Sequence, residues 1–192
     1  MKRIVIIHGW DGNPHEPMID WLKEELEKEG NEVIAPAMPN PEEPIIKDWV
    51  IAVLTTSQID KDTVLVGHSV GCQAVLRAME MMPEHTLVGG AILIAPWMEL
   101  DSNTIEEEGE EIVEIARPWM ETPINFEKIK QHAGNFFAIF SDNDPYVSVS
   151  QKDFFEKVLD TKTVLLHNYG HFAPQDNVKE VPDILEIIKK LI

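Results

Sequence analysis

The feature that most limits the fold of this chain is a regular alternation of two kinds of segment. Short runs rich in Val and Ile alternate, from one end to the other, with longer segments in which apolar residues recur every three or four positions. Apolar runs of strand length indicate strands buried on both faces, and the helices between them indicate crossover connections. The pattern predicts a three-layer α/β/α sandwich around a parallel sheet.

Six strands are expected from this alternation. They are placed at Arg3 to His8, Glu32 to Pro36, Thr63 to Gly67, Val88 to Ala95, Asn135 to Ser141 and Lys162 to His167. The first helix is marked by apolar residues at helical spacing and by a glycine that ends it, at Met18, Trp21, Leu22, Leu26 and Gly30. Further helices are expected at Pro44 to Ser57, Val70 to Met82, Val149 to Leu159 and Val178 to Leu191. Because no linker or repeat interrupts the alternation, residues 1–192 are expected to form a single domain.

One longer interruption, at about residues 97–134, separates the fourth expected strand from the fifth. It contains an acidic run at residues 106–111 and an apolar stripe made of Ile105, Ile112, Val113, Ile115 and Ala116. This combination predicts a small helical insertion with a solvated acidic face, rather than a binding site formed by the acids. The two prolines of the segment, Pro118 and Pro123, are compatible with a fixed cap and with a hinged one.

The charge balance excludes some classes of partner. The chain has 16 basic and 34 acidic residues and a formal net charge of −18, which would repel a polyanion, so we expect no nucleic-acid binding. Its only cysteine is Cys72, so no disulfide can form within the chain. The apolar run near the N-terminus stops after four residues at His8, which is too short for a signal peptide. We therefore expect a cytoplasmic protein that does not bind membranes.

The most informative motif is Gly67-His68-Ser69-Val70-Gly71, a G-x-S-x-G pentapeptide. It follows an expected strand and precedes an expected helix, which is the setting that a nucleophile elbow needs. The glycines would allow a cramped turn and a close approach of strand and helix, while Ser69 is held with its hydroxyl over the edge of the sheet. The other interpretation is a serine that caps a helix in a glycine turn.

A serine hydroxyl is a weak nucleophile at neutral pH, so this motif requires a base and a group that orients the base. The turn after the fifth expected strand supplies Asp142 and Asp144, and the segment after the sixth supplies His171. The order Ser, Asp, His is that of α/β-hydrolases. Each residue also has an ordinary interpretation, since Asp is common in turns and His171 could be a surface histidine. His167 lies four residues from His171, but across a glycine turn, so we expect no metal site there.

Acyl transfer by a serine also needs hydrogen-bond donors for the oxyanion of the tetrahedral intermediate. The backbone N–H of Val70, directly after the nucleophile, is one candidate. The backbone N–H of Trp10, in the turn after the first expected strand, is the other. The alternative for this turn is an ordinary strand end.

The segments HGWDGNP, GHSVG, SDNDPYVS and NYGHF resemble the α/β-hydrolase superfamily, and nearly the whole chain is similar to its compact retinoblastoma-binding protein 9-like serine hydrolase family. The resemblance implies a shortened α/β-hydrolase sheet with strand order 2-1-3-4-5-6. It also favours Asp144 over Asp142 as the acid, because Asp144 begins the hydrolase D-P-x-V pattern. It does not imply binding to the retinoblastoma pocket, which requires an L-x-C-x-E segment that is not present around Cys72. Cys72 is expected to be a small buried side chain rather than a second nucleophile.

These observations predict a serine hydrolase that cleaves a small ester, thioester or amide without a cofactor or a metal. The alternatives are a catalytically idle fold that serves as a binding protein, and other chemistry at the same elbow, such as perhydrolysis or lyase activity. The acidity of the chain favours a neutral or cationic small-molecule substrate. Candidates for the wall of the substrate pocket are Trp97, Met98, Trp119 and Met120, which could equally be core residues of the insertion.

Overall fold

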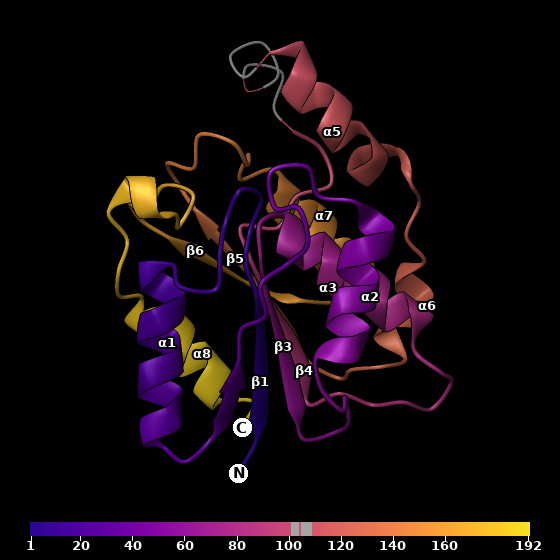
Figure 1. The fold of residues 1–192 in the computed structure, drawn as a ribbon, viewed down its shortest axis with the longest axis vertical. Helices are drawn as coiled ribbons and strands as arrows, with labels where there is room; N and C mark the ends of the chain where they lie inside the picture. Colours follow the sequence, from indigo (N-terminus) through magenta and orange to yellow (C-terminus); the bar gives the residue numbers. More distant parts are fainter. Residues whose placement is uncertain (101–103, 105–108) are drawn as a thin grey trace.

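The computed structural model describes residues 1–100, 104 and 109–192. Six parallel strands form one sheet in the order β2-β1-β3-β4-β5-β6 (Figure 1). The strands are β1 (Arg3–Ile7), β2 (Glu32–Ile34), β3 (Thr63–His68), β4 (Gly90–Ile94), β5 (Phe136–Ser141) and β6 (Lys162–Leu166). All six expected strands are present, and the expected order is confirmed.

Helices cover both faces of the sheet, as the alternating pattern predicted (Figure 1). Helices α1 (Pro17–Lys28) and α8 (Pro182–Lys189) pack on one face. Helices α2 (Ile46–Thr56), α3 (Val70–Met81), α6 (Phe126–Lys130) and α7 (Gln151–Leu159) pack on the other. The remaining helices within the described ranges are α5 (Glu110–Glu121) and the short 3₁₀ helix η1 (Pro174–Asp176).

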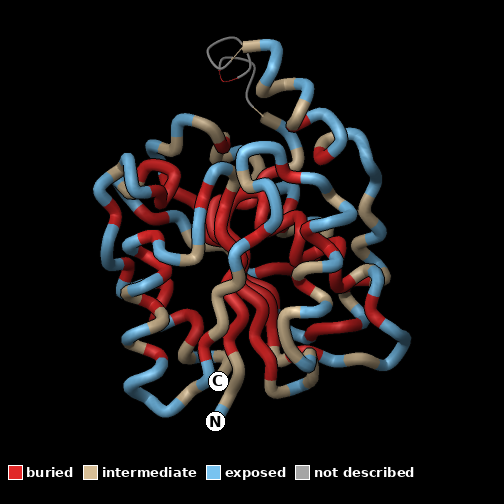
Figure 2. The backbone as a smooth tube through the Cα atoms, viewed as in Figure 1, coloured by how far each residue is buried: buried red, intermediate tan, exposed pale blue. Residues whose placement is uncertain are grey.

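The strands feed two separate cores because their side chains alternate between the faces of the sheet. In β1, Val5 and Ile7 pack among α2 and α3, whereas Ile4 and Ile6 pack among α1 and α8. Every residue of β3, β4 and β5 is buried, so the centre of the sheet has no solvated face (Figure 2). This double burial explains why the strands are continuous apolar runs in the sequence.

Three helices begin later than the sequence pattern predicted, among them α7, which begins at Gln151 instead of Val149. The last helix begins at Pro182 instead of Val178. Proline is well suited to the first turn, where its missing N–H is not needed, but it is unfavourable inside a helix. The second helix begins at Ile46, two residues after Pro44, because Ile45 between them is extended, with φ −102° and ψ 124°.

The insertion contributes α5, which lies beyond the carboxyl ends of the strands (Figure 1). Ala116 and Trp119 are buried on its inner side, and the acidic residues Glu110 and Glu111 lie in its first turn. Residues 105–108, with Ile105 and part of the acidic run, lie outside the described residues. The C-terminal end of α5 is tied to the body, because Arg77 of α3 donates to the backbone oxygens of Trp119 and Thr122.

No helix within the described ranges has the length and apolar character needed to cross a membrane.

Candidate active site

Ser69 lies at a sharp turn between β3 and α3, with φ 53° and ψ −124°. Non-glycine residues rarely adopt this conformation, and it persists only where the surroundings enforce it. The two glycines of the motif, Gly67 and Gly71, cannot be replaced by a larger residue without a collision. A Cβ atom added to Gly67 would lie 2.7 Å from the backbone of Cys72, and one added to Gly71 would lie 2.5 Å from the carbonyl oxygen of His8. The motif therefore has the tight strand–turn–helix geometry predicted from its sequence.

His171 and Asp144 form a buried pair beside this turn. His171 Nδ1 lies 2.8 Å from Asp144 Oδ2, and the two side chains are 10% and 2% exposed. The other carboxylate oxygen, Oδ1, accepts hydrogen bonds from the backbone N–H groups of Tyr146 and Val147. Because a carboxylate only accepts, His171 donates through Nδ1 and keeps Nε2 available as an acceptor.

The loop that carries His171 is held by hydrogen bonds on both sides. Asp176 Oδ2 accepts from the backbone N–H of His171 at 2.9 Å, and Asn143 Oδ1 accepts from that of Gly170 at 2.9 Å. On the inner side, His68 Nε2 donates to the carbonyl oxygen of His171 at 2.7 Å. The imidazole is thus positioned by its backbone as well as by Asp144.

Asp142 has a different partner. Its Oδ2 lies 2.6 Å from His167 Nδ1, and its Oδ1 accepts from the backbone N–H of Asn168. The hydrogen bond from His167, followed by that from Asn168, lowers the pKa of Asp142. The two side chains of this pair are 36% and 72% exposed, on the surface of the molecule. The structure therefore brings Asp144, and not Asp142, to His171.

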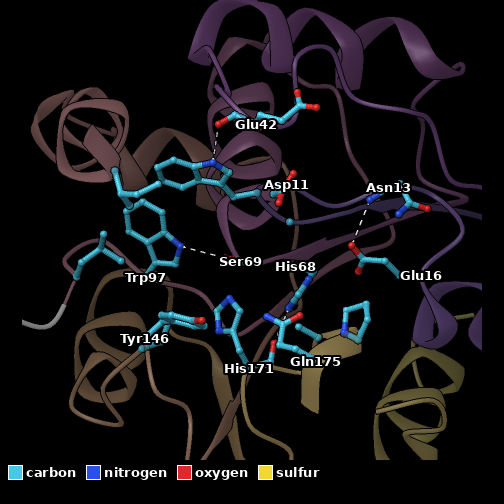
Figure 3. A pocket seen from close by; sticks show the side chains of 17 residues that line it. Asp11, Asn13, Glu16, Glu42, His68, Ser69, Trp97, Tyr146, His171 and Gln175 are labelled. Carbon is cyan, nitrogen blue, oxygen red and sulfur yellow. Dashed lines mark hydrogen bonds between the residues drawn. The ribbon is translucent and has the colours of Figure 1, made fainter. Parts of the chain in front are cut away.

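The hydroxyl of Ser69 faces Trp97. The indole Nε1 of Trp97 lies 3.4 Å from Ser69 Oγ, and Trp97 is 2% exposed (Figure 3). Within the described part of the chain, no hydrogen bond joins Ser69 Oγ to His171. The two expected oxyanion donors, the backbone N–H groups of Trp10 and Val70, make no hydrogen bond to another described residue.

A cavity of about 520 Å³ opens above these residues (Figure 3). Four of the residues predicted for the site line it: Trp10, Ser69, Trp97 and His171. The lining also includes Gly9, Asp11, Asn13, Glu16, Glu42, His68, Leu100, Ile112, Tyr146, Val147, Ala173, Pro174 and Gln175. The insertion therefore contributes to the cavity through Trp97, Leu100 and Ile112.

The remaining pocket candidates do not line this cavity, which corrects the prediction for them. Trp119 is fully buried, donates from its indole nitrogen to the carbonyl oxygen of Pro44, and packs edge-on against Trp49. Met98 and Met120 pack against the same apolar core. The physical reason is that the inner side of α5 must cover the core beside α2, so its large apolar residues are used for packing.

Some lining residues were missed from the sequence. His68 and Tyr146 could have been found, because His68 adjoins Ser69 and Tyr146 lies two residues after Asp144. The ring of Tyr146 also packs edge-on against that of His171, with centroids 5.1 Å apart. Glu16 carries no motif signal, since its place in the cavity depends on the path of the loop that connects β1 to α1.

Burial keeps two further histidines near the site neutral. Desolvation, followed by the charge of His171, lowers the pKa of His68 to about 3. Its Nδ1 is buried without a hydrogen-bond partner among the described residues. Burial also lowers the pKa of His8, whose Nδ1 donates to the carbonyl oxygen of Gly9 and whose Nε2 accepts from the N–H of Met38. Neither ring is therefore a charged group at neutral pH.

Cys72 is a buried residue of α3 behind the serine, as predicted. Its Sγ donates to the carbonyl oxygens of Gly67 and Ile94, and burial raises the pKa of the thiol well above its ordinary value. Since the thiolate is the reactive form, this environment is that of an inert side chain. Among the described residues, no group of three or more His, Cys, Asp or Glu side chains is arranged to hold a metal ion.

The chain is similar to known proteins along nearly its whole length. Residues 4–190 match the model of a family described as serine hydrolase. The chain is 24% identical to YdeN of Bacillus subtilis over 188 residues (97% of this chain, 94% of YdeN). It is 25% identical to the serine hydrolase RBBP9 of Rattus norvegicus over 189 residues (98% of this chain, 89% of RBBP9).

Solved structures show the same fold. The crystal structure of B. subtilis YdeN superimposes with a TM-score of 0.87 at 24% identity, covering 100% of this chain and 98% of YdeN. Est1E of Butyrivibrio proteoclasticus, solved with ferulic acid bound, gives a TM-score of 0.68 at 19% identity, covering 98% of this chain and 90% of Est1E. Since the family model matches residues 4–190, nearly the whole chain, the protein belongs to the serine hydrolase family.

Proposed function

We propose that this hydrolase cleaves a small carboxylic ester, thioester or amide through an acyl-enzyme on Ser69, with His171 as the general base and Asp144 as the group that orients it. The observation that carries the proposal is the buried His171–Asp144 pair, which shares one cavity with a serine held in a strained elbow. A serine on a strained strand-to-helix turn, next to a base that a carboxylate orients, is the arrangement of a nucleophile elbow.

The first half of the reaction forms the acyl-enzyme. Ser69 Oγ attacks the carbonyl carbon of the substrate while its proton passes to Nε2 of His171. Asp144 accepts from Nδ1 and stabilises the imidazolium that results. The carbonyl oxygen becomes an oxyanion, which the backbone N–H groups of Trp10 and Val70 would hold. Collapse of the intermediate breaks the bond to the leaving group, which takes the proton from Nε2.

The second half returns the free enzyme. Water attacks the acyl carbon as His171 Nε2 takes one of its protons, and the second tetrahedral intermediate then collapses. The proton goes to Ser69 Oγ as the carboxylic acid product leaves. In this scheme the protein groups and one water molecule carry every step, so it needs no cofactor.

Catalysis also requires the Ser69 hydroxyl to turn from Trp97 toward His171. The contact to Trp97 Nε1 is long, at 3.4 Å, so it is a weak hydrogen bond. Hydrogen bonds of catalytic residues are commonly loose before substrate binds. Rotation about the Cα–Cβ bond of Ser69 is the movement that turns the hydroxyl.

The substrate is proposed to be a small molecule, neutral or cationic. A cavity of about 520 Å³ suits a small ligand, and Trp10, Trp97 and Tyr146 give it an aromatic lining. The net charge of −18 disfavours an anionic substrate. Comparing neutral, anionic and cationic short-chain esters tests this proposal, and a clear preference for the anionic ester would overturn it.

The direct test of the function is turnover of p-nitrophenyl butyrate by wild type, by Ser69→Ala and by Ser150→Ala. Loss of the nucleophile is expected to reduce kcat by about 10³- to 10⁶-fold, because the members of such a triad act as a unit. Ser150 is exposed and lies away from the cavity, so its replacement is the matched control. Equal turnover by wild type and Ser69→Ala would contradict the proposal, and a folded but inactive wild type would favour the binding-protein alternative.

A further inference from the structure

Glu16 is a buried acid in the wall of the cavity that the mechanism does not use. It lies in the loop before α1, is 6% exposed and lines the same cavity as Ser69 and His171. Figure 3 shows its carboxylate turned from the wall toward the interior of the pocket. Acidic side chains are rarely buried unless they are paired, so its position calls for an explanation.

The contacts of Glu16 leave half of the carboxylate without a partner. Oε1 accepts from the backbone N–H of Asn13 at 3.2 Å. Oε2 is buried and has no hydrogen-bond partner among the described residues. Since an ionised carboxylate can accept about four hydrogen bonds, a buried one with a single amide donor is poorly compensated.

A structural role at the helix end does not account for this side chain. Glu16 stands at the N-cap position of α1, where a side chain often accepts from a backbone N–H of the first turn. The side chain of Glu16 makes no such bond. Only its backbone takes part, as its carbonyl oxygen accepts from the N–H of Asp20.

The charges around the cavity have one sign. Asp11, Glu16 and Glu42 contribute carboxylates to its described lining, which includes no Lys and no Arg. Desolvation by burial is the main influence on the pKa of Glu16 and raises it, against smaller opposing influences of the Asn13 hydrogen bond and the charge of His171. The cavity wall therefore contains a buried acid that a positively charged hydrogen-bond donor would stabilise.

We propose that Glu16 binds a cationic group of the substrate, an ammonium, through its unpartnered Oε2, which a rotation of the carboxylate would expose to the cavity of Ser69. This inference rests on the proposed function, because it assigns a substrate class to that site. An ammonium supplies both the missing hydrogen bond and the opposite charge, and a charge-assisted bond of this kind is stronger than a neutral one. Glu16 would then select among esters by their charge, without taking part in the proton transfers at Ser69.

The test is the binding of two matched ester pairs to Ser69→Ala protein, measured by calorimetry, so that no turnover is needed. Ethyl 6-aminohexanoate and ethyl heptanoate differ by an ammonium in place of a methyl group on the acyl side. 3-(Dimethylamino)propyl butyrate and 4-methylpentyl butyrate differ by a protonated nitrogen in place of a CH group on the alcohol side. The two pairs place the charge on either side of the ester bond.

We expect the cationic member of at least one pair to bind about 10- to 100-fold more tightly than its neutral partner, as for a hydrogen bond to a charged group. Adding Glu16→Gln should bring the two members within about twofold of each other, since the amide keeps the shape but not the charge. Asp20→Asn is the matched control. Asp20 is exposed on α1 and pairs with His15, so its neutralisation should leave the preference unchanged.

Equal binding of the members of both pairs to Ser69→Ala protein would overturn the inference, even before Glu16 is altered. A preference that survives Glu16→Gln would overturn it as well. Turnover of the neutral p-nitrophenyl butyrate by wild type decides the proposed function separately. If wild type hydrolyses the neutral ester and Ser69→Ala protein binds charged and neutral esters equally, the role of Glu16 is rejected and the hydrolase mechanism is retained.

Discussion

The molecule contains two His–Asp pairs of nearly equal geometry in very different surroundings. His171 and Asp144 are 2.8 Å apart, and their side chains are 10% and 2% exposed. His167 and Asp142 are 2.6 Å apart, and their side chains are 72% and 36% exposed. The members of the two pairs are only four and two residues apart in the sequence. Contact distance alone therefore does not separate a catalytic pair from a surface pair.

The surroundings do separate them. The His171–Asp144 pair lies against the cavity of Ser69, and the remaining oxygen of Asp144 is used by two backbone N–H groups. The Asp144 side chain is only 2% exposed, so its hydrogen bond to the imidazole is little screened by solvent and can fix the tautomer. The exposed pair is screened by solvent, and its Asp142 also holds the backbone of Asn168. We interpret the first pair as catalytic and the second as a surface interaction that holds the end of β6 to the turn after β5.

The largest expected difference comes from the two histidines. His171→Ala should lower kcat for p-nitrophenyl butyrate by about 10⁶-fold, because it removes the base, whereas His167→Ala should change it by less than about twofold. Steady-state kinetics on both variants, with circular dichroism to verify folding, measures this. A comparable loss in His167→Ala would show that the surface pair contributes to catalysis.

The next largest difference comes from the two acids. Asp144→Asn should lower kcat by about 10⁴-fold, because the amide no longer holds His171 in the required tautomer. Asp142→Asn should retain kcat and KM, since Asp142 does not contact His171. The same ester assay compares the two variants, and a greater loss in Asp142→Asn would reverse the assignment of the acid.

A smaller effect is expected from the backbone that carries His171. Asp176 Oδ2 accepts from the N–H groups of His171 and Ala173 without touching a reacting atom. Asp176→Ala should therefore lower kcat by about 10- to 100-fold through misplacement of the imidazole, while Asp144 stays in place. Asp176→Asn, which retains one carbonyl oxygen, should recover most of the loss. A kcat unchanged in Asp176→Ala would show that the hydrogen bonds to Asp176 are not needed to position the ring.

The last expected effect concerns stability rather than activity and compares a buried histidine with an exposed one. The pKa of His68 is lowered from 6.5 to about 3, so the unfolded chain binds more protons than the folded one between these values. Stability should therefore fall as the pH drops from 6.5 toward 3, by at most about 1.4 kcal/mol per pH unit from this group. His68→Gln should flatten this dependence in urea unfolding between pH 7 and pH 4, and His167→Gln should not. Equal slopes for wild type and His68→Gln would contradict the burial argument.

The fold was predictable because its signals are local. Apolar runs in β3, β4 and β5 reflect burial on both faces. The last glycine of the G-x-S-x-G motif is needed because Gly71 lies close to the carbonyl oxygen of His8. The helix that begins at Pro182 was placed too early, because its apolar stripe continues into the preceding loop. Periodicity thus identified the elements and left their ends uncertain by a few residues.

The site was predictable only in part, because its walls depend on tertiary packing. The elbow, the order of Ser69, Asp144 and His171, and the nearby Trp10 and Trp97 follow from strand ends that meet at one edge of a parallel sheet. Trp119 and Glu16 show where this reasoning stops. Nothing in the sequence distinguishes a tryptophan that covers the core from one that lines a cavity, or an acid at a helix start that faces water from one that faces a substrate.

The central claim is that Ser69 is activated by His171, and the most direct measurement is the mass of the intact protein after treatment with a fluorophosphonate. Wild type and His167→Ala should each gain a single adduct, located on Ser69 by peptide mapping. Ser69→Ala and His171→Ala should gain none over the same time. Absence of an adduct on folded wild type, or an adduct that persists in His171→Ala, would contradict the account.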